Sequence, residues 1–183
     1  MRKIQDRITL GITAGLLANM IKQSLSYILK KTGLVEITAP DKAGAMFVSK
    51  KTTQKPHGTL VGIIADFCIA CELGIALTYY ISATGKDNYL LKGLSMGSMC
   101  WAAMYGLLSR LGGTGFNLIK PRDSISGFIT HGVFGLAAAK LIVSLGEGSL
   151  FKPHYQTLSN PENDSRRVAR DDMQYRDEEV LTY

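Results

Sequence analysis

Long apolar segments alternate with polar ones along this chain. Four segments carry almost no charge, at residues 8–29, 60–82, 90–111 and 125–145. An α-helix of roughly 20 residues crosses the hydrocarbon core of a bilayer. A buried helix of a soluble bundle usually keeps one polar stripe toward water, whereas the polar positions here are isolated. The pattern therefore predicts an all-α membrane protein, with a four-transmembrane-helix bundle in residues 1–146.

The segments between and after these spans are polar. In the loop of residues 33–57, Asp41 follows Pro40 and can cap a short helix, with Met46 and Phe47 on one side of it. Flanking lysines favour an interfacial helix at the headgroup boundary; a flexible basic loop is the alternative, and the sequence leaves both open. The polar tail, residues 147–183, has few large aliphatic side chains from residue 160 onward. This composition predicts disorder, or order only on a soluble partner of residues 160–183.

The charge balance agrees with a membrane protein. The net charge is +6 with 46% apolar residues, and the lysines cluster beside the spans, which suits anionic lipid headgroups. No basic patch interleaved with aromatic residues indicates nucleic-acid binding. The apolar stretch behind "MRKIQDR" is too long for a cleavable signal, so we expect the first span to be an uncleaved anchor.

The three cysteines, Cys68, Cys71 and Cys100, lie inside predicted spans. Redox chemistry needs an accessible, electropositive thiol, and a zinc site needs further thiol or imidazole ligands. We therefore interpret all three as buried small hydrophobic residues and expect no metal or other cofactor.

Glycines recur every four residues on one face of each predicted span. Small residues at this spacing allow close approach of helix backbones in a membrane, so these faces are expected to point at other helices. The glycines are Gly11, Gly15, Gly58, Gly62, Gly93, Gly97, Gly127 and Gly135.

Three of the four glycine faces also carry an ionisable side chain, namely Lys22, Asp66 and His131. At 1.5 Å per residue, these groups and Tyr105 lie about 9–10 Å below the same membrane surface. An unpaired charge there costs roughly 2.5–3.5 kcal/mol. We therefore expect a Lys22–Asp66 ion pair with His131 and Tyr105 hydrogen-bonded beside it. This buried polar layer, with Glu72 and Asn19 as further candidate members, is either a set of contacts that fixes helix register, or an ion, proton or small-ligand site.

Two further charges fall within the spans. Glu72 is rotated about 120° from Asp66 and lies near mid-membrane, with Asn19 and Trp101 as its expected neighbours. Lys140 lies on the opposite face from His131, about 8 Å from the other surface, and is expected to extend its ammonium toward that surface on the lipid side.

Three short motifs resemble the YagU-like bacterial inner-membrane proteins. They are "GITAGLLANMIK" in the first span, the glycine-rich third span with Trp101, and "SGFITHGVFG" in the fourth. The resemblance covers roughly residues 8–146. It implies a four-span, multi-pass protein of the bacterial cytoplasmic membrane, whose activity is poorly established and has a suggested link to acid tolerance. It carries over Lys22 and His131 as polar positions. The family's Pro- and Arg-rich stretch after the first span is replaced here by "TAPDKAGAMFVSKK", and the tail has no counterpart.

No H-E-x-x-H, G-x-S-x-G or phosphate-binding glycine loop is present, so we predict that the protein is not an enzyme. One hypothesis is a non-catalytic subunit or scaffold, which packs through its small-residue faces into a homo-oligomer or larger membrane complex. The alternative is a small channel or a proton- or ion-linked transporter that uses the Lys/Asp/His layer. The first is favoured because broken helices and internal repeats, which are typical of transporters, are not evident. The Lys/Arg distribution leaves the orientation of the termini open.

Overall fold

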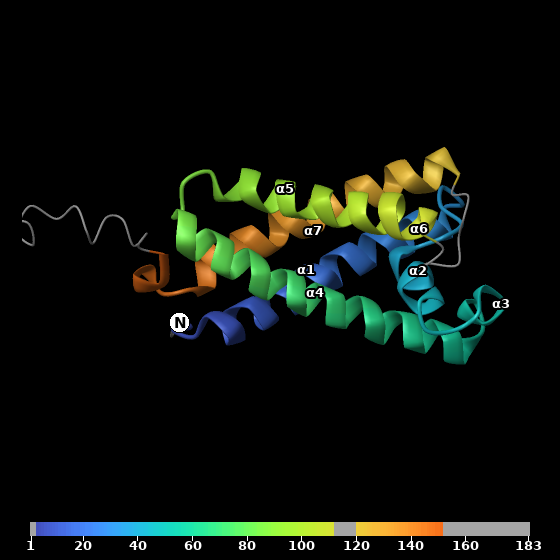
Figure 1. Cartoon of the computed structure of the whole chain (residues 1–183), viewed down its shortest axis with the longest axis horizontal. Coiled ribbons are helices and arrows are strands. Elements are labelled where there is room, and N and C mark those ends of the chain that lie inside the picture. The colour runs from blue at the N-terminus through green and yellow to red at the C-terminus, as the bar shows by residue number, and fades with distance from the viewer. Residues whose placement is uncertain (1–2, 112–119, 152–183) are drawn as a thin grey trace, which may run out of the picture.

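The computed structural model describes residues 3–111 and 120–151, and this part of the chain is helical. Four long helical segments run side by side along the long axis of the molecule (Figure 1). They coincide with the predicted spans to within a few residues. Of these, α4 and α7 are long and apolar enough to cross a membrane. The segments are α1 (Arg7–Lys31), α4 (Pro56–Thr84), α5 (Tyr89–Trp101) with its continuation through the π-helix η1 (Ala102–Leu107) and α6 (Leu108–Arg110), and α7 (Pro121–Leu145).

Local signals explain where the long helices begin and end. The Asp6 side chain caps α1, because its Oδ2 accepts a hydrogen bond from the backbone N–H of Thr9 at 2.6 Å. Pro56 and Pro121 occupy the first position of α4 and α7, where a missing N–H costs nothing. Gly85 ends α4 with a φ of 83°, a conformation that favours glycine.

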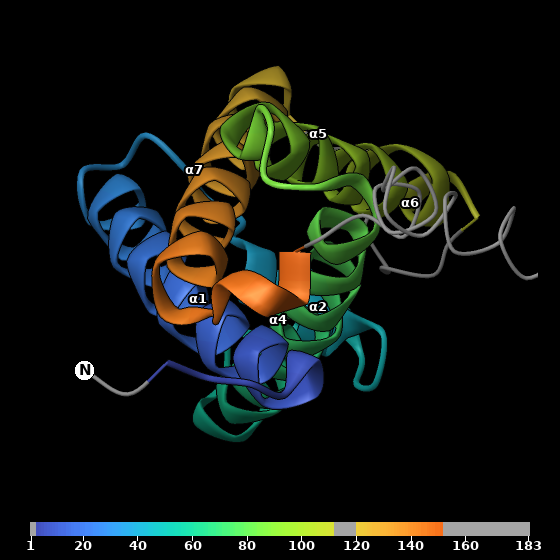
Figure 2. The ribbon, with the colours of Figure 1, turned by 90° about the vertical axis from the view of Figure 1, so that its left-hand side faces the viewer.

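The helices follow one another around the bundle axis in the order α4, α1, α7, α5 (Figure 2). The extensive contacts are α4 with α1, α1 with α7, and α7 with α5. The contact between α4 and α5 is slight, and other elements occupy the space between them at either end of the bundle.

One end of the bundle, which we call the apolar half, has a mainly apolar core, with Thr78 and Ser82 of α4 as buried polar side chains. It holds the first turns of α1, the last turns of α4 and α7, and the start of α5. The 3-10 helix η2 (Gly148–Phe151) covers this end and buries Leu150 and Phe151 against the same core. The fully buried side chains of this core include Leu10, Leu77, Ile81, Phe134 and Ile142.

The folded part of the chain thus extends past the expected boundary at residue 146. A backbone hydrogen bond from Glu147 N–H to Ile4 O, at 3.0 Å, ties residue 147 to the N-terminal segment. The two apolar side chains of η2 explain why residues 147–151 belong to the bundle and not to the polar tail. The predictions for residues 160–183 lie outside the described residues.

The eight predicted glycines all lie against another part of the chain. A Cβ on Gly11 or Gly15 would come within 3.0 Å of the α4 backbone, and one on Gly93 or Gly97 would meet the α7 backbone equally closely. The glycines of α4 differ from the expectation in their partners. Gly58 and Gly62 pack against the short helices between α1 and α4, and not against a long helix.

These short helices, α2 (Ala39–Ala45) and α3 (Lys50–Thr53), fill the opposite end of the bundle (Figure 1). Asp41 fixes the start of α2 by accepting hydrogen bonds from Thr38 N–H at 2.9 Å and from Lys30 Nζ at 3.0 Å. Gly44 of α2 lies directly against Gly62 of α4. Because of this close approach, one side of α2 faces the interior of the bundle.

The expectation of a helix lying flat at the membrane surface, with its lysines toward headgroups, was therefore wrong in one respect. Met46 and Phe47 are exposed on the outside, but Lys42 is only 3% exposed and points inward. Most residues of α2 are therefore buried inside this end of the bundle.

Candidate functional site

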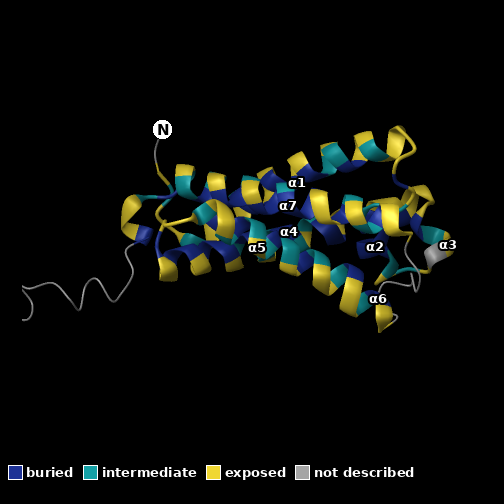
Figure 3. Cartoon of the chain, turned by 90° about the horizontal axis from the view of Figure 1, so that it is seen from above, coloured by how far each residue is buried: buried dark blue, intermediate teal, exposed yellow. Residues whose placement is uncertain are grey.

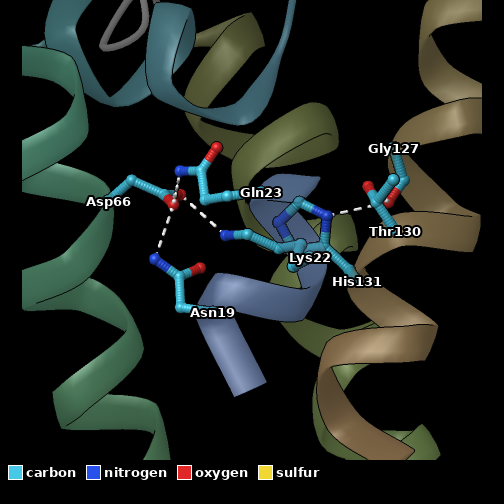
Figure 4. Close-up of polar contacts among 7 residues, drawn as sticks. All are labelled: Asn19, Lys22, Gln23, Asp66, Gly127, Thr130 and His131. Atoms are coloured by element: carbon cyan, nitrogen blue, oxygen red, sulfur yellow. Dashed lines mark hydrogen bonds and ion pairs between the residues drawn. The ribbon is translucent and has the colours of Figure 1, made fainter. Parts of the chain in front are cut away.

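Asp66 of α4 is the centre of a buried polar cluster. Its carboxylate accepts three hydrogen bonds from successive polar residues of α1 (Figure 4). Lys22 Nζ lies 2.7 Å from Oδ1, while Asn19 Nδ2 and Gln23 Nε2 donate to Oδ2 at 3.0 and 2.6 Å. The side chains of Lys22 and Asp66 are only 5% and 6% exposed. The ion pair that the sequence predicted is therefore present, and two amides complete the environment of its carboxylate.

His131 lies beside the ion pair but makes its hydrogen bond elsewhere. Its Nδ1 is 2.8 Å from the carbonyl oxygen of Gly127, one turn earlier in α7, so Nδ1 carries the proton and donates it (Figure 4). Among the described residues, no hydrogen bond joins His131 or Tyr105 to Lys22 or Asp66. The expectation that His131 and Tyr105 are hydrogen-bonded to the ion pair was thus wrong, and for His131 the reason is that a backbone carbonyl on its own helix lies within reach of the imidazole.

Tyr105 packs against this histidine from the π-helix η1. The two rings meet edge to face with centroids 5.6 Å apart. A Cβ on Gly127 would overlap the Tyr105 ring, so the glycine is what makes room for it. Short π-helical stretches within α-helices occur frequently at functional sites.

Lys42 brings a second buried ammonium group to the cluster from α2. Its Nζ lies 2.9 Å from the centroid of the Tyr105 ring, a cation–π contact, and it is a buried nitrogen without a hydrogen-bond acceptor. Burial lowers the pKa of Lys42 to about 7, and the Asp123 carboxylate opposes this shift. The Asp123 Oδ1 accepts a hydrogen bond from Glu36 N–H at 3.0 Å, whereas its buried Oδ2 has no partner.

A small cavity of about 20 Å³ lies at the centre of the cluster. This volume is enough for one water-sized guest. A second cavity, of about 10 Å³, lies on the side of Asp123, and Tyr105 borders both. The polar side chains that line the central cavity are Lys22, Lys42, Asp66, Cys100, Tyr105 and His131.

Donors exceed acceptors around the central cavity. The Asp66 oxygens already receive three hydrogen bonds, and the Lys42 ammonium has three N–H groups without an acceptor. Within residues 3–111 and 120–151, no three His, Cys, Asp or Glu side chains are arranged to hold a metal ion. The cluster can therefore hold and exchange protons, or bind a group that accepts hydrogen bonds. The described residues offer no set of ligands for a metal cation.

Glu72 lies outside this cluster. It is exposed on the outer face of α4, beside a hollow of about 420 Å³. Its expected neighbours are engaged elsewhere, because Asn19 donates to Asp66 and the Trp101 Nε1 donates to Ser124 O at 2.9 Å. The rotation of about 120° from Asp66 turns Glu72 away from the bundle axis. The other residues that line the hollow are Met46, Phe47, Val61, Ile64, Ala65, Cys68 and Ile69.

The cysteines differ from one another in burial. Cys100 is buried and lines the central cavity, as a small buried residue should. Cys71 is half-buried and Cys68 is exposed. The prediction of three buried cysteines was therefore wrong for Cys68, which lies one helical turn before Glu72 and shares its outer face.

Comparisons with models of protein families, with curated proteins and with solved structures gave no match. The resemblance to the YagU-like proteins therefore stays a prediction.

Sequence reasoning missed three residues of the site. Gln23 is adjacent to Lys22, and its contact with Asp66 follows from the same helical face. Lys42 and Asp123 were interpreted as parts of a loop and of a helix start. The Thr38-x-x-Asp41 pattern, which resembles a capping box, could have indicated the rotational phase of α2 and hence the inward direction of Lys42.

Proposed function

We propose that this chain is a four-span membrane protein that acts as a non-catalytic subunit of a homo-oligomeric ring. The observation that carries the proposal is an exposed carboxylate, Glu72, near the middle of α4 and beside a large apolar hollow.

The outer surface of the bundle supports four spans. Besides α4 and α7, α1 and the α5–α6 segment carry exposed positions along their length (Figure 3), and the residues at these positions are largely apolar. Asn19 and Lys22, which lower the hydropathy of α1, are buried inside. A water-soluble bundle would have the reverse arrangement. The exposed large hydrophobic residues on these two segments include Ile8, Leu17, Met20, Ile21, Ile28, Leu90, Leu91, Met99 and Leu107.

Glu72 is costly to leave against lipid. A carboxylate at the centre of a transmembrane helix costs roughly 2.5–3.5 kcal/mol, and such groups usually find a partner. The adjacent hollow exposes apolar side chains, Met46 and Phe47 among them, that a neighbouring helix would cover. A helix that carries a cation and bulky apolar residues fits this surface.

The outer face of α7 has these properties. Lys140 is exposed there, as is Leu136 one turn before it. Asp66 and His131 line the same cavity, so depth can be counted from them. Glu72 lies about 9 Å and Lys140 about 13.5 Å beyond that level. A lysine side chain spans the difference of roughly 4.5 Å, and it leans toward the N-terminus of its helix.

The two helices run in the same direction (Figure 1). A Glu72–Lys140 pair between copies therefore sets Leu136 of one copy over the hollow of the next. The glycine faces cannot form this contact, because they are occupied within the chain. A contact between different faces of identical subunits is heterologous, and it forms a ring when the rotation between copies closes.

Charge reversal tests this contact directly. Glu72→Lys and Lys140→Glu each create a like-charge pair, so each should convert the oligomer to monomers in native mass spectrometry from nanodiscs. The double variant should restore the oligomer. Asp87→Lys, in the α4–α5 connection, is the matched control and should leave assembly unchanged.

Cross-linking supplies a second readout. One tagged copy keeps Cys68 and lacks other cysteines, and a differently tagged copy carries Leu136→Cys alone. A short bis-maleimide should cross-link the two cysteines, so that both tags appear in one covalent dimer. A monomeric parent chain, or a double charge swap that fails to restore assembly, would contradict the proposal. Co-purification of the protein with a different membrane protein, through a contact that needs Glu72, would also contradict the proposal. It would indicate a larger complex.

The channel or transporter alternative is less favoured by the geometry. The polar cluster ends at the apolar half, where Leu10, Leu77 and Ile142 fill the centre of the bundle. Localisation in a bacterial cytoplasmic membrane rests on the family resemblance.

A further inference from the structure

Lys42 has no role in the contact between copies proposed above. It is 97% buried, it lies on a helix outside the four spans, and its ammonium has no hydrogen-bond acceptor among the residues that the structure describes. A buried charge without a hydrogen-bonded partner is strongly unfavourable. Natural proteins retain a buried charge where another charged or hydrogen-bonding group, such as a bound ion, interacts with it.

From this group and its surroundings, we propose that the central cavity is a binding site for one monatomic halide of chloride size, held between the ammonium groups of Lys42 and Lys22. The cavity is lined by both lysines, and its volume of about 20 Å³ admits one such ion and excludes sulfate, phosphate or a carboxylate.

The hydrogen-bonding capacity of the cavity favours an anion. Lys22 gives one N–H to Asp66 and keeps two, while Lys42 directs part of its ammonium at the Tyr105 ring and keeps its remaining N–H groups. Cys100 adds a weak S–H donor to the lining. The unprotonated Nε2 of His131 is an acceptor in the same lining, but these donors outnumber it, so an occupant that only accepts hydrogen bonds satisfies them best.

Two carboxylates act against an anion, and the geometry limits both. Asp66 also lines the cavity, but its oxygens are occupied by hydrogen bonds from Asn19, Lys22 and Gln23. Asp123 lines the second cavity, on the other side of Tyr105. It attracts Lys42 through space and therefore competes with the anion for that ammonium.

Halide titrations of the full-length protein in nanodiscs test the site. At pH 6, sodium chloride should raise the unfolding temperature with a saturating response, and sodium gluconate at equal ionic strength should not, since gluconate is too large for the cavity. Broadening of the ³⁵Cl nuclear magnetic resonance line should follow the same saturation curve. Both responses are readouts of the ion itself.

Three variants complete the test. Lys42→Met should weaken chloride binding at least tenfold, whereas Lys31→Met, which removes an exposed lysine of α1, should leave it unchanged. Asp123→Asn removes the competing charge and should tighten binding several-fold, which keeps the test decisive if Lys42→Met folds poorly. An equal response to gluconate, a saturating chloride response that persists in Lys42→Met, or unchanged affinity in Asp123→Asn would overturn the proposal.

Discussion

The two halves of the bundle solve the problem of helix packing in different ways. In the apolar half, glycines let α1 and α4, and α5 and α7, approach until their backbones touch. In the polar half, which contains Asp66, Tyr105 and Lys42, α2 touches α4 through Gly44 and Gly62, and α1 and α4 are joined by hydrogen bonds and an ion pair. The first half has few buried polar groups, among them the hydroxyls of Thr78 and Ser82. The second half has small cavities and buried charges.

This difference suggests a division of roles. Close backbone contact gives the bundle a fixed geometry through dispersion forces alone. The polar half then depends on that frame, because Asp66 can meet Lys22 only if α1 and α4 are held at the correct distance and rotation. The functional proposals concern the polar half and the outer face beside it.

The largest expected effect comes from breaking the buried ion pair. Asp66→Asn leaves the Lys22 ammonium buried without a counter-charge, which should destabilise the fold by about 3–5 kcal/mol. The double variant Lys22→Met, Asp66→Leu removes both charges and should recover most of that loss. Equilibrium unfolding in mixed micelles measures both. If Asp66→Asn is as stable as the parent, the ion pair does not contribute to the free energy of unfolding.

A smaller loss should follow from filling the apolar half. Gly74→Ala inserts a methyl group against the backbone of Gly11 and Gly15, which should cost about 1–3 kcal/mol. Gly106→Ala is the matched control, since a Cβ there meets nothing within 4 Å. The same unfolding assay applies. Equal stability of these two variants would contradict the distinction between a tight half and a looser one.

The polar half should also respond to pH through Lys42. Its folded-state pKa of about 7 lies below the ordinary 10.5, so between these values the unfolded chain holds a proton that the folded chain lacks. Stability should therefore rise with pH from about 7 to 10 in chloride-free buffer. Lys42→Met should flatten this slope. A slope that is unchanged in Lys42→Met would assign it to the other titratable groups that surround Lys42, which are Lys22, Asp41, Asp66, Cys100, Tyr105, Asp123 and His131.

The smallest effect is expected at the entry to the apolar half, where Asp6 caps α1. Hydrogen bonds from Thr9 lower the pKa of Asp6. The stabilisation by the charged cap is therefore present above the ordinary pKa and is lost as the pH falls through the lowered value. Asp6→Ala should speed amide hydrogen exchange in the first turn of α1 at neutral pH, whereas Asp6→Asn, which keeps a capping oxygen, should change it less. Equal exchange in the two variants would remove the cap from the account.

The parts of the structure that could be predicted from sequence depend on position along a single helix. Helix length, the glycine spacing and the depth of Lys22 and Asp66 all follow from 1.5 Å per residue and 100° per residue. These rules were enough to pair α1 with α4. They also correctly turned Lys140 outward.

The predictions were wrong where the surroundings of a side chain depended on how a second helix packs against its own. The neighbours expected for Glu72 shared its depth, but depth does not give rotation, and Glu72 faces outward. His131 was expected to meet Asp66, but the carbonyl of Gly127 was nearer. The Thr38-x-x-Asp41 pattern gives the rotational phase of α2, but the burial of Lys42 also depends on how closely α2 approaches α4 through Gly44 and Gly62, which involves a second helix.

The central claim is that opposite charges neutralise one another inside the bundle while it is surrounded by lipid. Solid-state nuclear magnetic resonance in bilayers measures this directly, through the dipolar coupling between ¹⁵N at lysine Nζ and ¹³C at the aspartate carboxyl carbon. Given the 2.7 Å separation of Lys22 Nζ and Asp66 Oδ1, we predict strong dephasing in the parent, a large part of which is lost in Lys22→Met. Dephasing that is identical in the parent and in Lys22→Met would contradict the account.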